Sequence, residues 1–197
     1  MCDLVPHPIT YTALILAGGQ GTRMGGRDKG WVLWQGKPLI EHVLSRIQAQ
    51  TLTPSEVLIS ANRSVPDYAL TGAQVVRDER PGFAGPLAGV EAGLLHAKSA
   101  WVLVVPCDMP CVPLDLAQRL FNSALNCGQG QHPWMVAVDG QPQPLCLAIP
   151  KARLSSLQAY LDAGGSRVKA WLDQQGVQII AFKDALAFAN INSIDEG

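Results

Sequence analysis

Short apolar runs alternate with longer amphipathic segments along the chain. The apolar runs show little polar alternation, which is typical of parallel strands buried on both faces, and we expect strands at 13–17, 57–60, 74–76, 101–105, 135–138 and 177–182. Between them apolar residues recur every three or four positions, which predicts helices over 38–50, 86–97, 113–126, 151–163 and 167–175. This alternation predicts an α/β fold: one three-layer α/β/α domain with a mostly parallel sheet.

Length and charge narrow the function classes. The 197 residues suit a single domain, 1–197, with one large core. With 15 basic and 16 acidic side chains the formal net charge is −1, so no chain-wide field attracts nucleic acid or a membrane surface. No apolar stretch reaches the length of about 18 residues needed to span a membrane. The N-terminus lacks the pattern of a secretory leader, and we expect a cytoplasmic protein.

The number and spacing of the cysteines argue against a disulfide-stabilised protein and against a zinc protein. Five cysteines form an odd set without a Cys-x-x-Cys pair, so we expect neither a disulfide framework nor a zinc site.

Residues 14–29 lead from an apolar segment into a glycine-rich loop with three basic side chains. Glycine can adopt positive φ angles and approach a ligand closely, so that backbone amides point at phosphate oxygens. The loop contains Gly18, Gly19, Gly21, Gly25, Gly26, Arg23, Arg27 and Lys29. This composition predicts a cradle for nucleotide phosphates.

Two well-known phosphate loops do not fit this segment. A P-loop requires Ser or Thr after Gly-Lys, whereas Lys29 follows Asp28 and precedes Gly30. A dinucleotide fingerprint requires Gly-x-Gly-x-x-Gly, and Met24 occupies the place of its last glycine.

A single carboxylate, Asp108, follows the most apolar run and is flanked by Pro106 and Pro110. Mg²⁺ prefers carboxylate oxygen together with substrate phosphates, so one Asp at the end of a strand can anchor a magnesium nucleotide. An Asp that only stabilises a turn by bonding its own backbone is the alternative.

The glycine-rich loop resembles the Leu-Ala-Gly-Gly signature of the nucleotidyltransferases, and within them the molybdenum cofactor guanylyltransferases, the MobA family. The pattern Gly-Gly-x-x-x-Arg-Met-Gly-Gly-x-Asp-Lys is followed by the apolar stretch 31–34 and by Gly-Lys-Pro-Leu at 36–39, as in that family. Sugar-phosphate nucleotidyltransferases have a longer spacer after the arginine, and this spacer is missing. The Cys-Asp-Met-Pro element at 107–110 also matches. The resemblance implies the Rossmann-like nucleotidyltransferase fold.

The resemblance also implies a reaction. The family transfers GMP from GTP to the terminal phosphate of molybdopterin with Mg²⁺, forms the guanine dinucleotide cofactor and releases pyrophosphate. Further expected partners are molybdenum-insertion proteins and apo-molybdoenzymes or their chaperones. Cytidylyl transfer to molybdopterin, another nucleotidyl transfer, and non-catalytic delivery of the cofactor are the alternatives.

The family's site residues can be placed on this sequence one by one. Arg23, Lys29 and Asp108 are expected to be catalytic, with Asp108 holding the metal. The resemblance places the GTP site in the part 11–110, at Leu16, Ala17, Gly18, Gly19, Gly21, Lys29, Ser60, Asn62, Asp78 and Asp108. The family usually has Asn where this chain has Ser60, which offers fewer hydrogen-bonding groups.

The resemblance assigns pterin binding to the part 111–197. The candidate residues are Gln143, Arg167, Lys169, Asn190 and Asn192. The alternatives are a solvated helix start for Arg167 and Lys169, and turn formation for the two asparagines.

Overall fold

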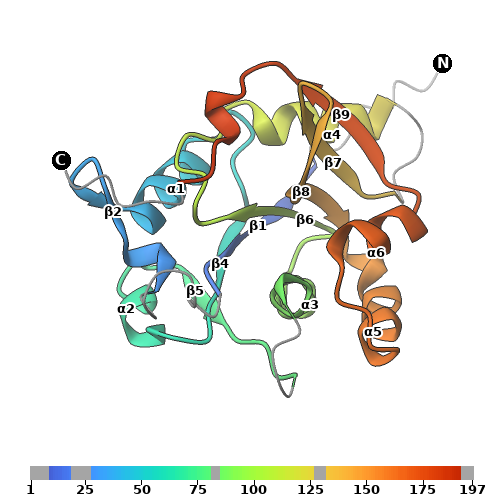
Figure 1. Ribbon diagram of the computed structural model, residues 1–197, viewed down its shortest axis with the longest axis horizontal. Helices are drawn as coiled ribbons and strands as arrows, with labels where there is room; N and C mark the ends of the chain where they lie inside the picture. Colours follow the sequence, from blue (N-terminus) through green and yellow to red (C-terminus); the bar gives the residue numbers. More distant parts are fainter. Residues whose placement is uncertain (1–8, 19–27, 81–84, 127–131, 192–197) are drawn as a thin grey trace.

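A seven-stranded sheet forms the centre of the molecule (Figure 1). The computed structural model describes residues 9–18, 28–80, 85–126 and 132–191. In sheet order the strands are β5 (Gln74–Val76), β4 (Glu56–Ser60), β1 (Tyr11–Leu16), β6 (Trp101–Pro106), β8 (Gln141–Pro150), β7 (Trp134–Val138) and β9 (Gln178–Phe182). Neighbouring strands are parallel except at β8, which runs antiparallel to both β6 and β7. The predicted mostly parallel sheet is confirmed.

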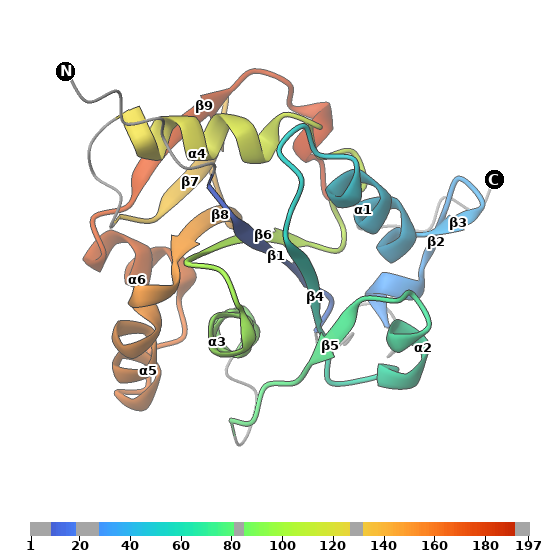
Figure 2. The same ribbon diagram turned by 180° about the vertical axis from the view of Figure 1, so that it is seen from behind.

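Helices cover both faces of the sheet (Figures 1 and 2). One face packs on α1 (Leu39–Gln48), α2 (Val65–Ala69) and α4 (Leu116–Asn126), and the other on α3 (Pro86–His96), α5 (Leu154–Asp162) and α6 (Val168–Gln174). Successive side chains of β1 alternate between the two cores: Ala13 and Ile15 join the first, and Leu14 and Leu16 the second. The predicted three-layer domain is therefore confirmed.

Short elements complete the chain. The hairpin strands β2 (Leu33–Trp34) and β3 (Lys37–Pro38) form a separate two-stranded sheet among the described residues. The 3₁₀ helices are Lys29–Trp31 (η2), Lys151–Arg153 (η3) and Leu186–Phe188 (η4). The predicted helix 113–126 begins only at Leu116. The buried Gln50 side chain accepts a hydrogen bond from Ala117 N (2.9 Å) and donates one to Pro113 O (2.7 Å), which caps the helix at this later position.

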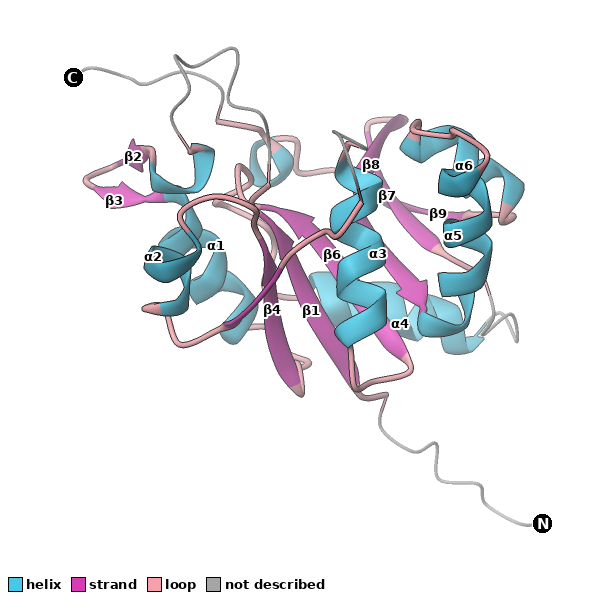
Figure 3. Ribbon diagram, turned by 90° about the horizontal axis from the view of Figure 1, so that it is seen from below, coloured by secondary structure: helices cyan, strands magenta, loops and turns pink. Residues whose placement is uncertain are grey.

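Helix α3 lies over the sheet, as Figure 3 shows from below. Two of its glycines allow it to approach the strands closely. A Cβ atom on Gly93 would lie 2.2 Å from Leu14 Cδ2, and one on Gly89 would lie 2.6 Å from Ser60 Oγ. Glycine costs about 1 kcal/mol in a helix interior, so its presence here is explained by close packing. The contact places the start of α3 beside the carboxyl ends of β1 and β4.

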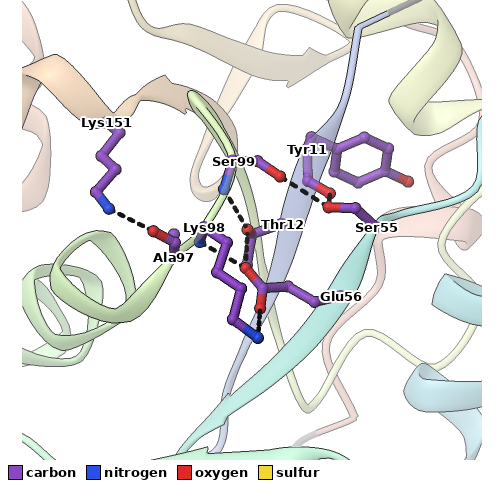
Figure 4. A network of polar contacts seen from close by, with 8 residues as sticks. All are labelled: Tyr11, Thr12, Ser55, Glu56, Ala97, Lys98, Ser99 and Lys151. Carbon is purple, nitrogen blue, oxygen red and sulfur yellow. Dashed lines mark hydrogen bonds and ion pairs between the residues drawn. The ribbon is translucent and has the colours of Figure 1, made fainter.

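A polar network joins the opposite end of the sheet (Figure 4). Glu56 Oε1 accepts hydrogen bonds from Thr12 Oγ1 (2.7 Å) and Lys98 N (2.6 Å), and Lys98 Nζ lies 3.3 Å from Glu56 Oε2. Lys151 donates to Ala97 O at the end of α3. Burial raises the pKa of Glu56, but these hydrogen bonds and the Lys98 charge outweigh it, so the pKa lies below its ordinary value.

The lowered pKa of Glu56 predicts a pH-dependent contribution to stability. Because the folded-state pKa lies below the unfolded one, the contribution is present above the unfolded pKa and is lost as pH falls through the folded pKa. Urea unfolding should show Glu56→Gln destabilised by about 0.5 kcal/mol at pH 7, since the amide keeps an acceptor oxygen but loses the charge. At a pH below the folded-state pKa of Glu56 the two proteins should converge.

The matched control for this experiment is Glu41→Gln, at an exposed carboxylate 3.8 Å from Lys37. An exposed pair of this kind should contribute little to stability. An equal loss for Glu56→Gln at both pH values would contradict the ionic role of Glu56.

Candidate active site

Residues predicted for nucleotide binding follow four neighbouring strands. Ala17 comes directly after β1, and Asn62, Asp78 and Asp108 each lie two residues beyond β4, β5 and β6. Because these strands are parallel and adjacent in the sheet, their carboxyl ends meet at one edge. Backbone hydrogen bonds tie the ends together beyond the strands, from Ala17 N to Ser60 O (2.9 Å), Ala61 N to Val76 O (3.1 Å) and Cys107 N to Leu16 O (3.0 Å).

An ion pair lies at the centre of this edge. Lys29 Nζ is 2.5 Å from Asp108 Oδ2, and the exposed fractions of the two side chains are 29% and 16%. The residues stand 79 positions apart in the sequence, so the fold brings together two of the three predicted catalytic residues. The third, Arg23, lies outside the described residues.

The other carboxylate oxygen of Asp108 is buried and lacks a hydrogen-bond partner within the part of the chain that the structure describes. A buried acceptor without a partner is costly unless another group satisfies it. Asp108 therefore does not act as a turn residue that bonds its own backbone through this oxygen. One oxygen held by a lysine and one left for a ligand is an arrangement that suits a divalent cation.

The Cys107 thiol beside Asp108 is an unsuitable nucleophile. Burial, together with the neighbouring Asp108 charge, raises the pKa of Cys107 to about 12. The thiol therefore remains protonated near neutral pH, and the thiolate is the reactive form.

Asn62 and Asp78 contact each other. Asn62 Nδ2 donates to Asp78 Oδ2 (2.5 Å), and Asp78 N donates to Asn62 Oδ1 (3.1 Å). Ser60 is buried, with an exposed fraction of 3%, and its hydroxyl lies under Gly89 of α3. Asn62 and Asp78 thus present polar groups at the edge of the sheet, whereas Ser60 is covered by α3.

Arg80 fixes the segment that carries Asp78. Its guanidinium makes two hydrogen bonds to Glu91 on α3 (2.6 and 2.8 Å) and one to Asp162 on α5 (2.8 Å). These hydrogen bonds to Glu91 and Asp162 raise the pKa of Arg80, so it is permanently charged. Arg80 lines a cavity of about 280 Å³ together with Asp78 and Glu91. Sequence reasoning did not identify this arginine.

Sequence reasoning also missed a connection between η2 and α2. Asp28 Oδ1 accepts hydrogen bonds from Gly30 N (3.2 Å) and from the buried Tyr68 Oη (2.5 Å). Asp28 thus caps η2, the element that carries Lys29.

Comparisons with known proteins identify the family of the chain. The family described as MobA-like NTP transferase domain matches residues 13–179. The chain belongs to this family. A molybdenum cofactor guanylyltransferase of Cupriavidus metallidurans is 43% identical over 94% of this chain and 91% of its own length. One of Shewanella putrefaciens is 41% identical over 96% and 95% of the two chains.

Solved structures share the fold of this MobA-like domain. Molybdopterin-guanine dinucleotide biosynthesis protein A from Archaeoglobus fulgidus has a TM-score of 0.74 at 23% identity over 93% of both chains. 4-Diphosphocytidyl-2C-methyl-D-erythritol synthase from Anaerococcus prevotii has a TM-score of 0.70 at 13% identity, covering 94% of this chain and 92% of its own. Because both share one fold, the fold alone does not define the nucleotide.

The described pterin candidates of the MobA-like domain lie on β8, at the start of α6 and in the segment after η4. Gln143 is half-buried on β8, exposed Arg167 directly precedes α6, and exposed Lys169 pairs with Asp173 one helical turn away (2.9 Å). This pairing is what the solvated-helix alternative predicts for Lys169. Asn190 is exposed, and the next residue's amide, Ile191 N, donates to Asp108 O (2.9 Å), so this segment returns to the ion pair.

Several predicted residues of the domain lie outside the described part of the chain: Gly19, Gly21, Arg23 and Asn192. Of the remaining loop residues, Leu16 and Ala17 are buried, and Gly18 is exposed near Ser60 O. Within the described ranges, no cluster of three His, Cys, Asp or Glu side chains could hold a metal ion. No helix in those ranges combines the length and the apolar character needed to cross a membrane.

Proposed function

We propose that this protein transfers GMP from GTP to the terminal phosphate of molybdopterin and releases pyrophosphate. The observation that carries the proposal is the Lys29–Asp108 pair at the end of β6, with one buried Asp108 oxygen left without a described partner. The names of the relatives, molybdenum cofactor guanylyltransferases, support guanylyl transfer as the reaction.

The proposed cofactor is Mg²⁺, held by Asp108. A magnesium ion takes one or two protein carboxylates and completes its shell with water and phosphate oxygens, so a single Asp is sufficient. The unpartnered Oδ1 supplies the required ligand. Bound there, Mg²⁺ would neutralise charge on the GTP phosphates.

The transfer needs no general base. A phosphate oxygen of molybdopterin bonds to the α-phosphorus of GTP, and the bond from that phosphorus to the pyrophosphate oxygen breaks. The second pKa of a phosphate monoester is about 6, so the nucleophile is already ionised near neutral pH. Positioning and charge neutralisation therefore supply the catalysis.

Each group at the sheet edge has a proposed role. Backbone amides of the segment 18–21 hold the nucleotide phosphates, since Ala17 N already donates to Ser60 O. Lys29 and Arg23 stabilise the charge of these phosphates. Asn62 and Asp78 bind the guanosine, and Ser60 supports the site through its carbonyl, which accepts from Ala17 N at the start of the phosphate-binding segment. The part 11–110 binds the nucleotide, and the part 111–197 binds the pterin through Gln143, Arg167, Lys169, Asn190 and Asn192.

The partners in this proposal follow from the reaction. GTP and molybdopterin are the substrates, and molybdenum-insertion proteins and apo-molybdoenzymes or their chaperones would supply or receive the cofactor. The net charge of −1 gives no support for a nucleic-acid or membrane partner. A cytoplasmic location remains a prediction.

Nucleotide choice provides the direct test. With Mg²⁺ and molybdopterin, GTP should give the dinucleotide product and pyrophosphate, with kcat/KM at least about tenfold above that for CTP or ATP. Mass spectrometry of the product and a coupled pyrophosphate assay measure this. Equal or better use of CTP would favour cytidylyl transfer, and no pyrophosphate with any nucleotide would favour the delivery alternative.

A further inference from the structure

The buried hydroxyl of Tyr68 connects α2 to the element that carries Lys29. We propose that Tyr68, acting through Asp28, is a positioning residue that sets where Lys29 stands relative to the reacting phosphates. This inference rests on the proposed nucleotidyl transfer, in which Lys29 stabilises phosphate charge.

The Tyr68–Asp28 contact is short, and its donor is buried. Tyr68 is fully buried, and its Oη donates to Asp28 Oδ1 at 2.5 Å. Burial and the neighbouring Asp28 carboxylate raise the pKa of Tyr68, so the hydroxyl remains a donor throughout the pH range of an assay. A hydrogen bond from a buried donor to a charged acceptor is among the stronger ones in a protein.

The same oxygen of Asp28 holds the first turn of η2. Gly30 N donates to Asp28 Oδ1 (3.2 Å), so one carboxylate oxygen ties Tyr68 to the residues on both sides of Lys29. A side chain at position 30 would collide with the tyrosine, because an ideal Cβ there would lie 2.2 Å from Tyr68 Oη. Gly30 thus allows η2 to sit directly on the phenol.

A contact between two aromatic rings also holds η2 against Tyr68. The ring centroids of Trp31 and Tyr68 are 5.2 Å apart, with the planes tilted by 38°. Residues 28, 30 and 31 therefore all contact Tyr68, whereas the Lys29 side chain extends to Asp108. The backbone of Lys29 is fixed by its neighbours, and its ammonium group is fixed at the other end by the carboxylate.

The placement of Lys29 affects the rate because its side chain is long and flexible and its ammonium acts as a point charge. A displacement of about 1 Å in a charge-stabilising group can cost up to about 10²-fold in rate. Removing the hydroxyl of Tyr68 leaves Asp28 without its buried donor and loosens the cap of η2. Lys29 would still be present but less well placed, which should lower kcat more than it changes KM.

The experiment compares two buried tyrosines that each donate one short hydrogen bond. Tyr68→Phe removes the hydroxyl at Asp28, and Tyr11→Phe removes one that donates to Leu52 O (2.6 Å) at the opposite end of the sheet. Both should lower the free energy of unfolding, Tyr68→Phe somewhat more because its acceptor is a carboxylate. Only Tyr68→Phe should lower kcat, by about tenfold, with KM for GTP within about threefold of wild type.

A double-mutant cycle with Lys29→Ala tests whether the effect passes through the lysine. If it does, Tyr68→Phe should cause no further loss of kcat in the Lys29→Ala protein. Two substitutions at Asp28 give an independent arm. Asp28→Asn keeps an oxygen that can accept from both donors and should retain most of the activity, whereas Asp28→Ala should lose at least as much as Tyr68→Phe.

The outcomes separate this inference from the proposed function. If wild type forms no dinucleotide product, the proposed function fails. If wild type is active and Tyr68→Phe leaves kcat unchanged, or if its loss adds fully to that of Lys29→Ala, Tyr68 has only a structural role and the inference is overturned. If Tyr68→Phe does not fold, equal kcat values for Asp28→Ala and Asp28→Asn would overturn it in the same way.

Discussion

Asp108→Asn should abolish nucleotidyl transfer while the protein remains folded. Asparagine has the same shape as aspartate and keeps an oxygen within reach of Lys29, but it lacks the charge that holds a divalent cation. Loss of the cation removes the main neutralising group on the triphosphate, so turnover should fall by at least about 10³. Pyrophosphate release measures activity, and calorimetric titration of the magnesium nucleotide measures binding.

The structure also defines the expected stability of this variant. Asp108 is one partner of a partly buried pair, so removing its charge weakens a contact to Lys29 while relieving the unpartnered buried oxygen of its charge. These two effects oppose each other, and the melting temperature should change by no more than about 5 °C.

The matched control is Asp184→Asn. Asp184 Oδ1 accepts a hydrogen bond from Ala187 N (3.2 Å) and starts η4, a role that asparagine also performs. This variant should keep wild-type turnover. Magnesium-dependent activity in Asp108→Asn close to that of wild type would remove the central claim about the site.

The strands that position the site could be predicted from sequence because they are covered on both faces. The runs that became β1 and β6 are almost wholly apolar, and β4 has an apolar centre at 57–59, so their pattern alone indicates buried parallel strands. The carboxylate at the end of β6 then stands out, since it is the first charged residue after the most apolar run.

Strand β8 could not be predicted in the same way. Pro142 and Pro144 lack backbone donors and normally argue against a central strand. A register shift takes Pro144 out of the pairing, because Met135 of β7 pairs with Leu147 and the next residue, Val136, pairs with Gln143. Pro142 keeps its place opposite Ala137 of β7. Residues 144–146 thus have no partner on β7, an irregularity that depends on tertiary packing.

The candidate site, like the fold, could be predicted only in part from the sequence. Lys29 and Asp108 were predicted from motifs, and the structure brings them into contact. Tyr68 and Arg80 were not predicted, because each acts through a partner far away in sequence: Tyr68 through Asp28, and Arg80 through Glu91 and Asp162. A lone tyrosine or arginine between motifs has no pattern of its own, so only the folded structure reveals its role.

Lys29→Ala should lower turnover by about 10²–10³, the usual cost of losing one group that stabilises transition-state charge. The ammonium group stands 2.5 Å from Asp108 at the carboxyl end of β6, where the phosphates are proposed to bind. Because its contribution grows as charge develops in the transition state, kcat should fall more than the affinity for GTP. Steady-state kinetics of pyrophosphate release at saturating molybdopterin measure both parameters.

Two further lysine variants separate the role of charge from general effects of substitution. Lys98→Ala removes an ammonium with an exposed fraction of 80% at the far end of the sheet and should keep wild-type kcat. Lys29→Arg keeps the charge but places a planar guanidinium where a compact ammonium stood, so it should recover only part of the lost rate. Near-normal turnover in folded Lys29→Ala would identify Lys29 as a surface lysine whose only role is its contact with Asp108. Full recovery in Lys29→Arg would instead show that charge alone is required, and that the exact placement of the ammonium by η2 contributes little to the rate.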